Sequence, residues 1–173
     1  MAKLLIEPSE IVETTPIGGD VDIDKYLFTI ENTEIMTIEP LLGTELFDKI
    51  KEDNENDTLE GLYLTLYTDY VKPILKFKAT SEYISICSYM IKNGGVFKNA
   101  PQNKEIPERK EIEMFAGKYD ALAQMHIERF NKWILLNKLD EYKIDQDEVD
   151  AEDNLDTTAG WFFGDAQNND KWY

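Results

Sequence analysis

Apolar residues recur at every third or fourth position through most of this chain, and this spacing predicts helices. A first helix is expected from residue 23, with Asp22 or Asp24 capping its first turn, and Pro40 is expected to end it. A short helix should begin at Thr44, and a third should follow a cap at Asp57 or Thr58. The apolar positions of these helices are Ile23, Tyr26, Leu27, Ile30, Leu46, Phe47, Ile50, Leu59, Leu62, Tyr63, Leu66 and Tyr70.

The same spacing predicts two longer helices in the second half of the chain. Pro73 marks a kink or a fresh start, because proline cannot donate to the preceding turn. The pattern then runs to Lys92, and Asn93-Gly94-Gly95 is expected to end that helix, since glycine accepts the left-handed cap. Pro107 suits the first turn of a last helix of about thirty residues. Its apolar stripe is Ile112, Phe115, Tyr119, Leu122, His126, Phe130 and Trp133.

Neither end of the chain has this periodicity. Residues 1–22 predict an extended N-terminal arm, because Pro8, Pro16 and Gly18-Gly19 interrupt helices and residues 11–15 favour extended backbone. Residues 139–173 predict an irregular acidic C-terminal tail that ends in aromatic residues. The expected fold is therefore all-α, a helical bundle of four to five helices over residues 23–138 between an arm and a tail.

The formal net charge of −17 limits the possible functions of the protein more than the apolar content of 42% does. It argues against nucleic acid or an anionic membrane as a direct ligand, because phosphate groups bind to cationic surfaces. No apolar run approaches the length of a membrane span. The single Cys87 excludes an internal disulfide framework.

Acidic and basic residues are also unevenly distributed. Residues 1–70 contain four Lys or Arg against 17 Asp or Glu, residues 71–138 contain 12 against 7, and residues 139–173 contain 2 against 11. One interpretation is chance clustering on a solvated surface. The other is self-complementarity, in which the basic middle of one copy meets an acidic end of the next and forms a ring or a filament.

No motif in the chain predicts catalysis, a cofactor or a metal site. His126 is the only imidazole and lacks the neighbours that orient a general base, so a core or interface role is expected. Cys87 falls on the apolar side of its helix and fits a small buried hydrophobe. Residues 20–24, with Glu31 at the twelfth position, resemble half of a calcium loop, but Lys25 stands where that loop requires glycine. The expectation is that the protein is not an enzyme.

Two segments are candidates for docking to a partner. The C-terminal aromatics either fold back on their own core or enter a pocket of a neighbour, where Trp and Tyr commonly dominate binding energy. The N-terminal arm offers the same choice, through pairing within its own subunit or strand addition to another. The docking residues expected on this basis are Ile11, Val12, Trp161, Phe162, Phe163, Trp172 and Tyr173.

Two local phrases carry a resemblance to a known family. One is Tyr26 to Ile38 followed by Glu39-Pro40-Leu41-Leu42-Gly43-Thr44-Glu45-Leu46-Phe47, and the other is Tyr89-Met90-Ile91-Lys92-Asn93-Gly94-Gly95-Val96. Over about residues 20–138 the chain resembles the head–tail connector (adaptor) proteins of tailed bacteriophages. Leu42, Gly43 and Leu46 match the turn of that family, and Gly95 and Val96 match its helix stop.

The resemblance implies a structural virion protein with no catalytic residues. It implies a homo-oligomeric ring below the portal, dodecameric if it matches the symmetry of the portal, which extends the DNA channel and docks further neck and tail proteins. DNA would pass through without specific binding. The net charge of −17 adds the hypothesis that the inner wall is acidic and repels the DNA. The location implied is the head–tail neck of the virion, after assembly in the host cytoplasm. The alternatives are a cytosolic acidic helical adaptor or inhibitor that binds a basic partner, and an enzyme built around His126 or a carboxylate cluster.

Overall fold

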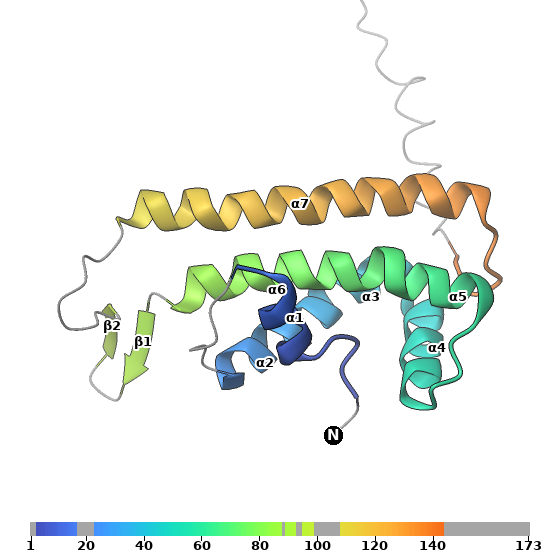
Figure 1. Cartoon of the computed structure of the whole chain (residues 1–173), viewed down its shortest axis with the longest axis horizontal. Helices are drawn as coiled ribbons and strands as arrows, with labels where there is room; N and C mark the ends of the chain where they lie inside the picture. Colours follow the sequence, from blue (N-terminus) through green and yellow to red (C-terminus); the bar gives the residue numbers. More distant parts are fainter. Residues whose placement is uncertain (1–2, 17–22, 88, 93–94, 99–107, 144–173) are drawn as a thin grey trace, which may run out of the picture. The chain divides into compact units, whose positions relative to one another are not determined.

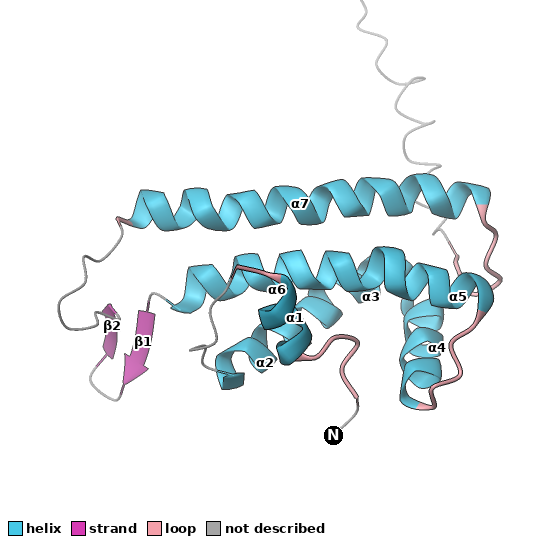
Figure 2. Ribbon diagram, in the orientation of Figure 1, coloured by secondary structure: helices cyan, strands magenta, loops and turns pink. Residues whose placement is uncertain are grey.

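The computed structural model describes residues 3–16, 23–87, 89–92, 95–98 and 108–143, and these form the expected all-α bundle (Figures 1 and 2). Within the described part there are five continuous helical runs and one two-stranded hairpin. The runs are α1 (Pro8–Thr14); α2 (Ile23–Thr33), π-helix η1 (Glu34–Ile38) and α3 (Glu39–Leu42); α4 (Thr44–Glu55); α5 (Gly61–Leu66), π-helix η2 (Tyr67–Val71) and α6 (Lys72–Cys87); and α7 (Arg109–Leu136).

Helix α6 is the centre of the bundle. Helix α7 lies along one side of it, and α1 and α2 lie on the other side (Figure 1). The edge of the Tyr26 ring meets the Tyr83 ring at a centroid distance of 4.4 Å, and the hydroxyls of Tyr26 and Thr80 are 2.8 Å apart. The compact unit spans residues 1–142, because Leu139 is buried and the Tyr142 ring packs against Phe130. The remaining unit, residues 143–173, lies outside the described residues from residue 144 on.

Pro40 does not end the first long helix, contrary to the sequence-based expectation. The helical run continues from Ile23 to Leu42 because η1 precedes the proline, and the N–H of Glu39 donates to the carbonyl of Glu34, five residues back. In a regular α-helix the proline ring would clash with the carbonyl four residues earlier. The wider π turn moves that carbonyl aside, so the helix ends only at Gly43, where φ is 77°.

Pro73 is accommodated in the same way. The N–H of Lys72 donates to the carbonyl of Tyr67, again five residues back, and the proline follows as the next residue. The run from Gly61 to Cys87 is therefore continuous, with a wide turn at the expected kink. Both prolines stand two residues after a π-helix.

The expectation of an extended N-terminal arm is wrong. Residues Pro8–Thr14 form α1, with the proline in the first turn, where its missing N–H costs nothing. The side chains of Leu5, Ile6 and Ile11 are buried in the core of the bundle. The β-favouring residues 11–15 were misleading because burial of the apolar side of this short helix outweighs local propensity.

The expected helix stop at residues 93–96 is also wrong. Helix α6 ends at Cys87, and β1 (Tyr89–Lys92) pairs antiparallel with β2 (Gly95–Lys98). Gly95 and Val96 are therefore strand residues, paired with Lys92 and Ile91. Two residues with the sequence Asn-Gly separate the strands, which is the favoured two-residue hairpin connection, and the flanking residues are rich in β-formers.

The turn at Leu42-Gly43 and the last helix match their predictions. Leu42 ends α3, Gly43 makes the connection, and α4 begins at Thr44 with Leu46 buried. Helix α4 has 12 residues and continues to Glu55, so it is longer than the short helix expected from the sequence. Helix α7 has 28 residues, and its first turn is closed by reciprocal hydrogen bonds between Glu108 and Glu111.

Candidate interaction surface

His126 lies against an aromatic ring and a basic side chain. Its ring stacks on Phe77 at a centroid distance of 5.5 Å, and its Nδ1 lies 3.2 Å from Nη1 of Arg129. Burial, and then the positive charges of Arg129 and Lys76, lower the pKa of His126 below 6.5. These neighbours favour a neutral ring held by packing, and none of them is a carboxylate that could orient it as a base.

The described part of the chain contains no cluster of side chains that could hold a metal ion. No three His, Cys, Asp or Glu residues there stand close enough to share an ion. Asp24 and Glu31, two of the half calcium loop, belong to helix α2 rather than to a loop. Asp20 and Asp22 lie outside the described residues, and Cys87 is half-buried at the end of α6.

The N-terminal segment is fastened to the bundle by a buried carboxylate. Glu34, in η1, is 2% exposed, and its Oε1 accepts a hydrogen bond of 2.6 Å from the N–H of Leu5. Its Oε2 accepts one of 2.8 Å from Nζ of Lys51 in α4. A buried carboxylate is tolerated when its oxygens are hydrogen-bonded and its charge is paired, and both conditions are met here.

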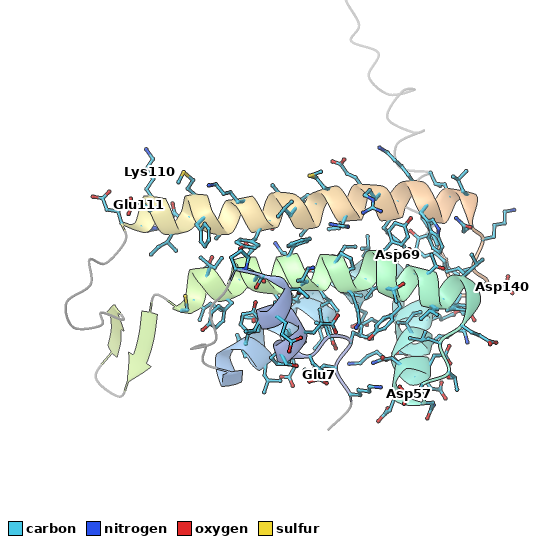
Figure 3. The ribbon with its side chains drawn as sticks, viewed as in Figure 1. Glu7, Asp57, Asp69, Lys110, Glu111 and Asp140 are labelled. Atoms are coloured by element: carbon cyan, nitrogen blue, oxygen red, sulfur yellow. The ribbon has the colours of Figure 1, made fainter. Side chains whose placement is uncertain are left out.

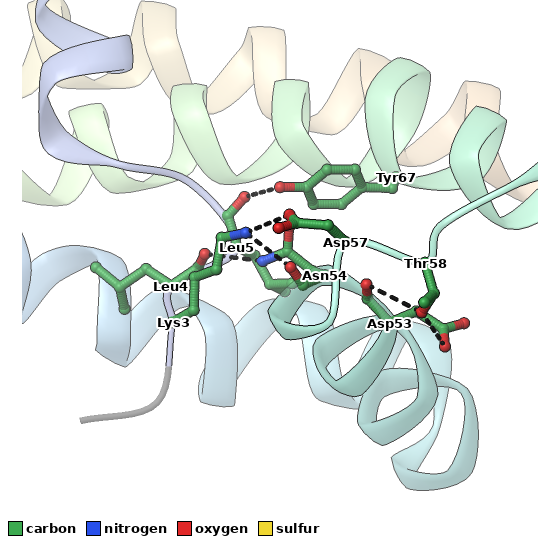
Figure 4. A network of polar contacts seen from close by, with 8 residues as sticks. All are labelled: Lys3, Leu4, Leu5, Asp53, Asn54, Asp57, Thr58 and Tyr67. Atoms are coloured by element: carbon green, nitrogen blue, oxygen red, sulfur yellow. Dashed lines mark hydrogen bonds and ion pairs between the residues drawn. The ribbon is translucent and has the colours of Figure 1, made fainter.

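Further polar contacts join the same segment to α4 and η2 (Figure 4). The hydroxyl of Tyr67 donates to the carbonyl of Leu5 over 2.7 Å, and Nδ2 of Asn54 donates to the carbonyl of Leu4 over 3.1 Å. Lys3 donates to the carbonyl of Asn54 and to Oδ1 of Asp57, each at 2.8 Å. Together with the Lys72–Glu10 ion pair at 2.7 Å, these contacts make the segment part of the bundle.

Ile11 is consequently not a docking residue, which corrects the sequence-based expectation. Its side chain is fully buried among its own chain's core residues, and that of Val12 is half-buried. The signal that sequence reasoning missed is the apolar triplet Leu4-Leu5-Ile6, which marks core residues ahead of the helix. The other expected docking residues, Trp161, Phe162, Phe163, Trp172 and Tyr173, lie outside the described residues.

The side of α7 that points away from α6 carries exposed apolar and basic side chains (Figure 3). We call this surface the outer face of α7 and define it by Met114, Lys118, Leu122, Met125, Lys132 and Leu136. These residues recur at intervals of three, four or seven, so they share one stripe of the helix. Met125 is 59% exposed and Leu136 is 84% exposed.

Lys118 and Lys132 give the outer face two basic side chains, while Glu111, three residues before Met114, adds a carboxylate at its N-terminal end. Asp120, nearby on α7, already bonds to Lys78 of α6 at 2.6 Å, and Glu128 lies beside the face. Arg129 adds a further cation at its edge and lies over the Tyr70 ring. Apolar side chains left in water on one helical stripe are typical of a surface that another molecule covers.

A second charged surface lies on α4. Glu45, Asp48, Glu52 and Glu55 are exposed and are spaced three or four residues apart, so they share one side of the helix. No apolar side chain interrupts this acidic stripe, which we call the acidic face of α4. The two surfaces differ both in charge and in apolar content.

A groove of about 410 Å³ between η1, α6 and α7 offers little to a charged ligand. Lys78, at its wall, is paired with Asp120 and also with Glu82 at 3.7 Å. Burial alone would lower the pKa of Lys78, but its bond to Asp120 and the charges of Asp120 and Glu82 raise it overall. The ammonium group of Lys78 is therefore protonated, and the carboxylates of Asp120 and Glu82 balance its charge.

Residues 38–150 match the family model described as "Family of unknown function (DUF6712)", and the chain belongs to this family. No curated protein and no solved structure matches the chain. Among the described helices, none combines the length and the apolar character that crossing a membrane requires.

Proposed function

We propose that this protein is the subunit of a homo-oligomeric ring in the head–tail connector of a tailed bacteriophage. The ring would sit below the portal, extend the DNA channel and dock further neck and tail proteins. Support comes from the resemblance of residues 20–138, from the all-α bundle, and from the intact Leu42-Gly43-Leu46 turn. The loss of the expected Gly95-Val96 helix stop weakens one of the two phrases on which the resemblance depends.

One observation carries the proposal of a ring. The outer face of α7 carries apolar and basic side chains, whereas the acidic face of α4 carries carboxylates. A symmetric contact through the outer face of α7 would bring Lys118 and Lys132 against their own counterparts. A symmetric contact through the acidic face of α4 would bring carboxylates together. Like charges that face each other across an interface oppose association, so unlike surfaces favour a head-to-tail contact. A head-to-tail contact closes into a ring when its rotation closes.

In such a ring the acidic face of α4 would line the channel. Carboxylates on a channel wall repel the phosphates of DNA, so the DNA passes without being held. The same face also favours the second candidate function, an acidic adaptor or inhibitor that binds a basic partner. The two candidates differ in oligomeric state, because the adaptor acts as a monomer and its binding weakens steeply with salt.

Electron microscopy of the purified protein, alone and mixed with portal rings from the same phage, tests the proposal. We expect rings with an axial channel that bind the portal. A monomer that ignores the portal and binds a basic protein only at low salt would support the adaptor instead. A ring whose channel is lined by Lys and Arg would contradict the acidic wall.

A further inference from the structure

We propose that the outer face of α7 in one copy receives the acidic, aromatic C-terminal segment, residues 144–173, of a second copy. This inference rests on the proposed function, because it names the contact through which copies of the subunit join head to tail. The occupant of the face must satisfy its apolar and its basic side chains together.

The apolar side chains of the outer face require an apolar partner. Met114, Leu122, Met125 and Leu136 are all exposed, and burial of such side chains contributes roughly 25 cal/mol for each Å² removed from water. Methionine side chains also adapt to partners of irregular shape. The acidic face of α4 offers only carboxylates and would leave these side chains in contact with water or with charge. A second copy's α4 is therefore a poor occupant.

The C-terminal segment offers both kinds of partner. Residues 144–173 contain nine Asp or Glu against one Lys, which complements Lys118 and Lys132. The same segment contains Trp161, Phe162, Phe163, Trp172 and Tyr173, and large aromatics dominate the binding energy of many interfaces. Most of the acidic residues, within 145–156, precede the aromatic cluster at 161–163, and Asp165 and Asp170 separate that cluster from Trp172 and Tyr173.

The length of the segment allows it to reach another subunit. Thirty residues in extended conformation span up to about 100 Å, whereas α7 with its 28 residues is about 42 Å long. The segment follows directly on Lys143, after the bundle is complete. It can therefore leave its own bundle and cover the full outer face of the next.

Two full-length variants test this contact. The face variant carries Leu122→Glu and Met125→Glu, and the tail variant carries Trp161→Ser, Phe162→Ser and Phe163→Ser. The control carries Leu62→Glu and Leu64→Glu, two exposed apolar residues of α5 outside the outer face. Sedimentation velocity over a range of concentrations measures self-association, and circular dichroism confirms that each variant is folded.

We expect the wild-type chain and the control to self-associate alike, and each test variant to do so at least about 30-fold more weakly. A mixture of the two test variants should form one-to-one pairs and nothing larger, because only the tail of the face variant and the face of the tail variant are intact. Lys118→Glu with Lys132→Glu should weaken association as well, and added salt should weaken it in the wild type.

Self-association that is unchanged in both test variants would overturn the contact. So would a wild-type chain that stays monomeric at all concentrations, with Trp161 cross-linking to α7 of the same chain, since the occupant would then be the protein's own segment. Portal binding is scored separately by pull-down. Oligomers that respond to both variants but ignore the portal would refute the connector role and leave the contact standing, and portal-binding rings insensitive to both variants would do the reverse.

Discussion

The backbone N–H of Leu5 donates a 2.6 Å hydrogen bond to Oε1 of Glu34, and this bond links the start of the chain to the middle of the 23–42 helical run. Lys51 holds the other oxygen of the same carboxylate from α4. Three segments that are far apart in the sequence therefore meet at one buried side chain. The N-terminal segment is an integral part of the bundle for this reason.

Replacing Glu34 with Ala should lower the free energy of unfolding by about 3 kcal/mol, because it leaves a buried N–H and a partly buried ammonium group without their acceptor. Urea unfolding followed by circular dichroism measures the loss. The matched control is Glu31→Ala, an exposed residue on α2, which should change the free energy by less than about 0.5 kcal/mol. Equal effects of the two substitutions would show that the carboxylate contributes nothing specific.

Replacing Ile11 with Ala should also lower the free energy of unfolding by about 3 kcal/mol, because the side chain is fully buried and its removal leaves a cavity. The neighbouring Val12→Ala removes two methyl groups from a half-buried side chain and should lower the free energy of unfolding by about 1 kcal/mol. Thermal or urea unfolding measures both. A normal unfolding curve for the Ile11 variant, with impaired binding of a partner, would restore the docking role that the structure takes away from this residue.

Sequence reasoning succeeded where one helix buries one stripe against one neighbour. The extent of α7 and the turn at Gly43 were predictable, because apolar spacing marks a long helix and glycine accepts the positive φ of the turn. The structure of α1 was not, since seven residues do not form a stable helix without tertiary contacts such as those of Ile11. The hairpin was missed because Asn93-Gly94 suits both a helix stop and a two-residue turn between strands.

Stability should fall as the pH drops through about 6.5, in part through His126. Burial, Arg129 and Lys76 lower the pKa of this ring in the folded protein, so the unfolded chain takes up a proton at higher pH than the folded one does. The contribution of His126 to the free energy of unfolding is fully present above the pKa that the ring has in the unfolded chain. It is lost as the pH falls toward the lower pKa of the folded protein. Unfolding free energies at about pH 8 and about pH 5.5, compared between the wild type and His126→Gln, measure it. An identical pH dependence in both would exclude the contribution.

At alkaline pH two buried tyrosines should limit stability. Burial raises the pKa of Tyr26 to about 12, despite its bond to Thr80, and burial followed by the charges of Glu10 and Glu34 raises that of Tyr67 to about 12. Stability from these groups is present below the ordinary value of 10.0 and is lost as the pH rises toward 12. Unfolding midpoints and tyrosinate absorbance against pH test this.

Tyr67→Phe separates the hydroxyl from the ring in the same experiment. This substitution should lower the free energy of unfolding by about 1 kcal/mol at neutral pH, because the hydrogen bond to the carbonyl of Leu5 is lost. It should also make the alkaline loss of stability shallower than in the wild type. A steeper loss would mean that the Tyr67 hydroxyl ionises more readily in the folded protein than in the unfolded chain.

The candidate interaction surface was predictable only in part. The basic character of the middle of the chain and the acidic character of its ends follow from counting, and the structure locates exposed examples on α7 and α4. Which apolar residues of α7 are left exposed did not follow, because the expected stripe included Leu122 and Phe115 as core residues and both are exposed. A helix that packs on one side only, as α7 does on α6, carries more apolar positions than that side can bury.

The π-helix η1 keeps the buried side chains of the 23–42 helical run on one side of the helix. Tyr26, Ile30, Glu34, Ile38 and Leu42 are all buried, one at every fourth residue. An unbroken α-helix advances about 100° per residue, so it would turn Leu42 about 160° away from Tyr26. The extra residue of the wide turn takes back about 100° of that drift and returns Leu42 toward the core. Winding this turn as regular α-helix without deleting a residue would therefore rotate the Leu42 end of the helix toward solvent, and the wide turn keeps the two halves of the helix in phase with their neighbours.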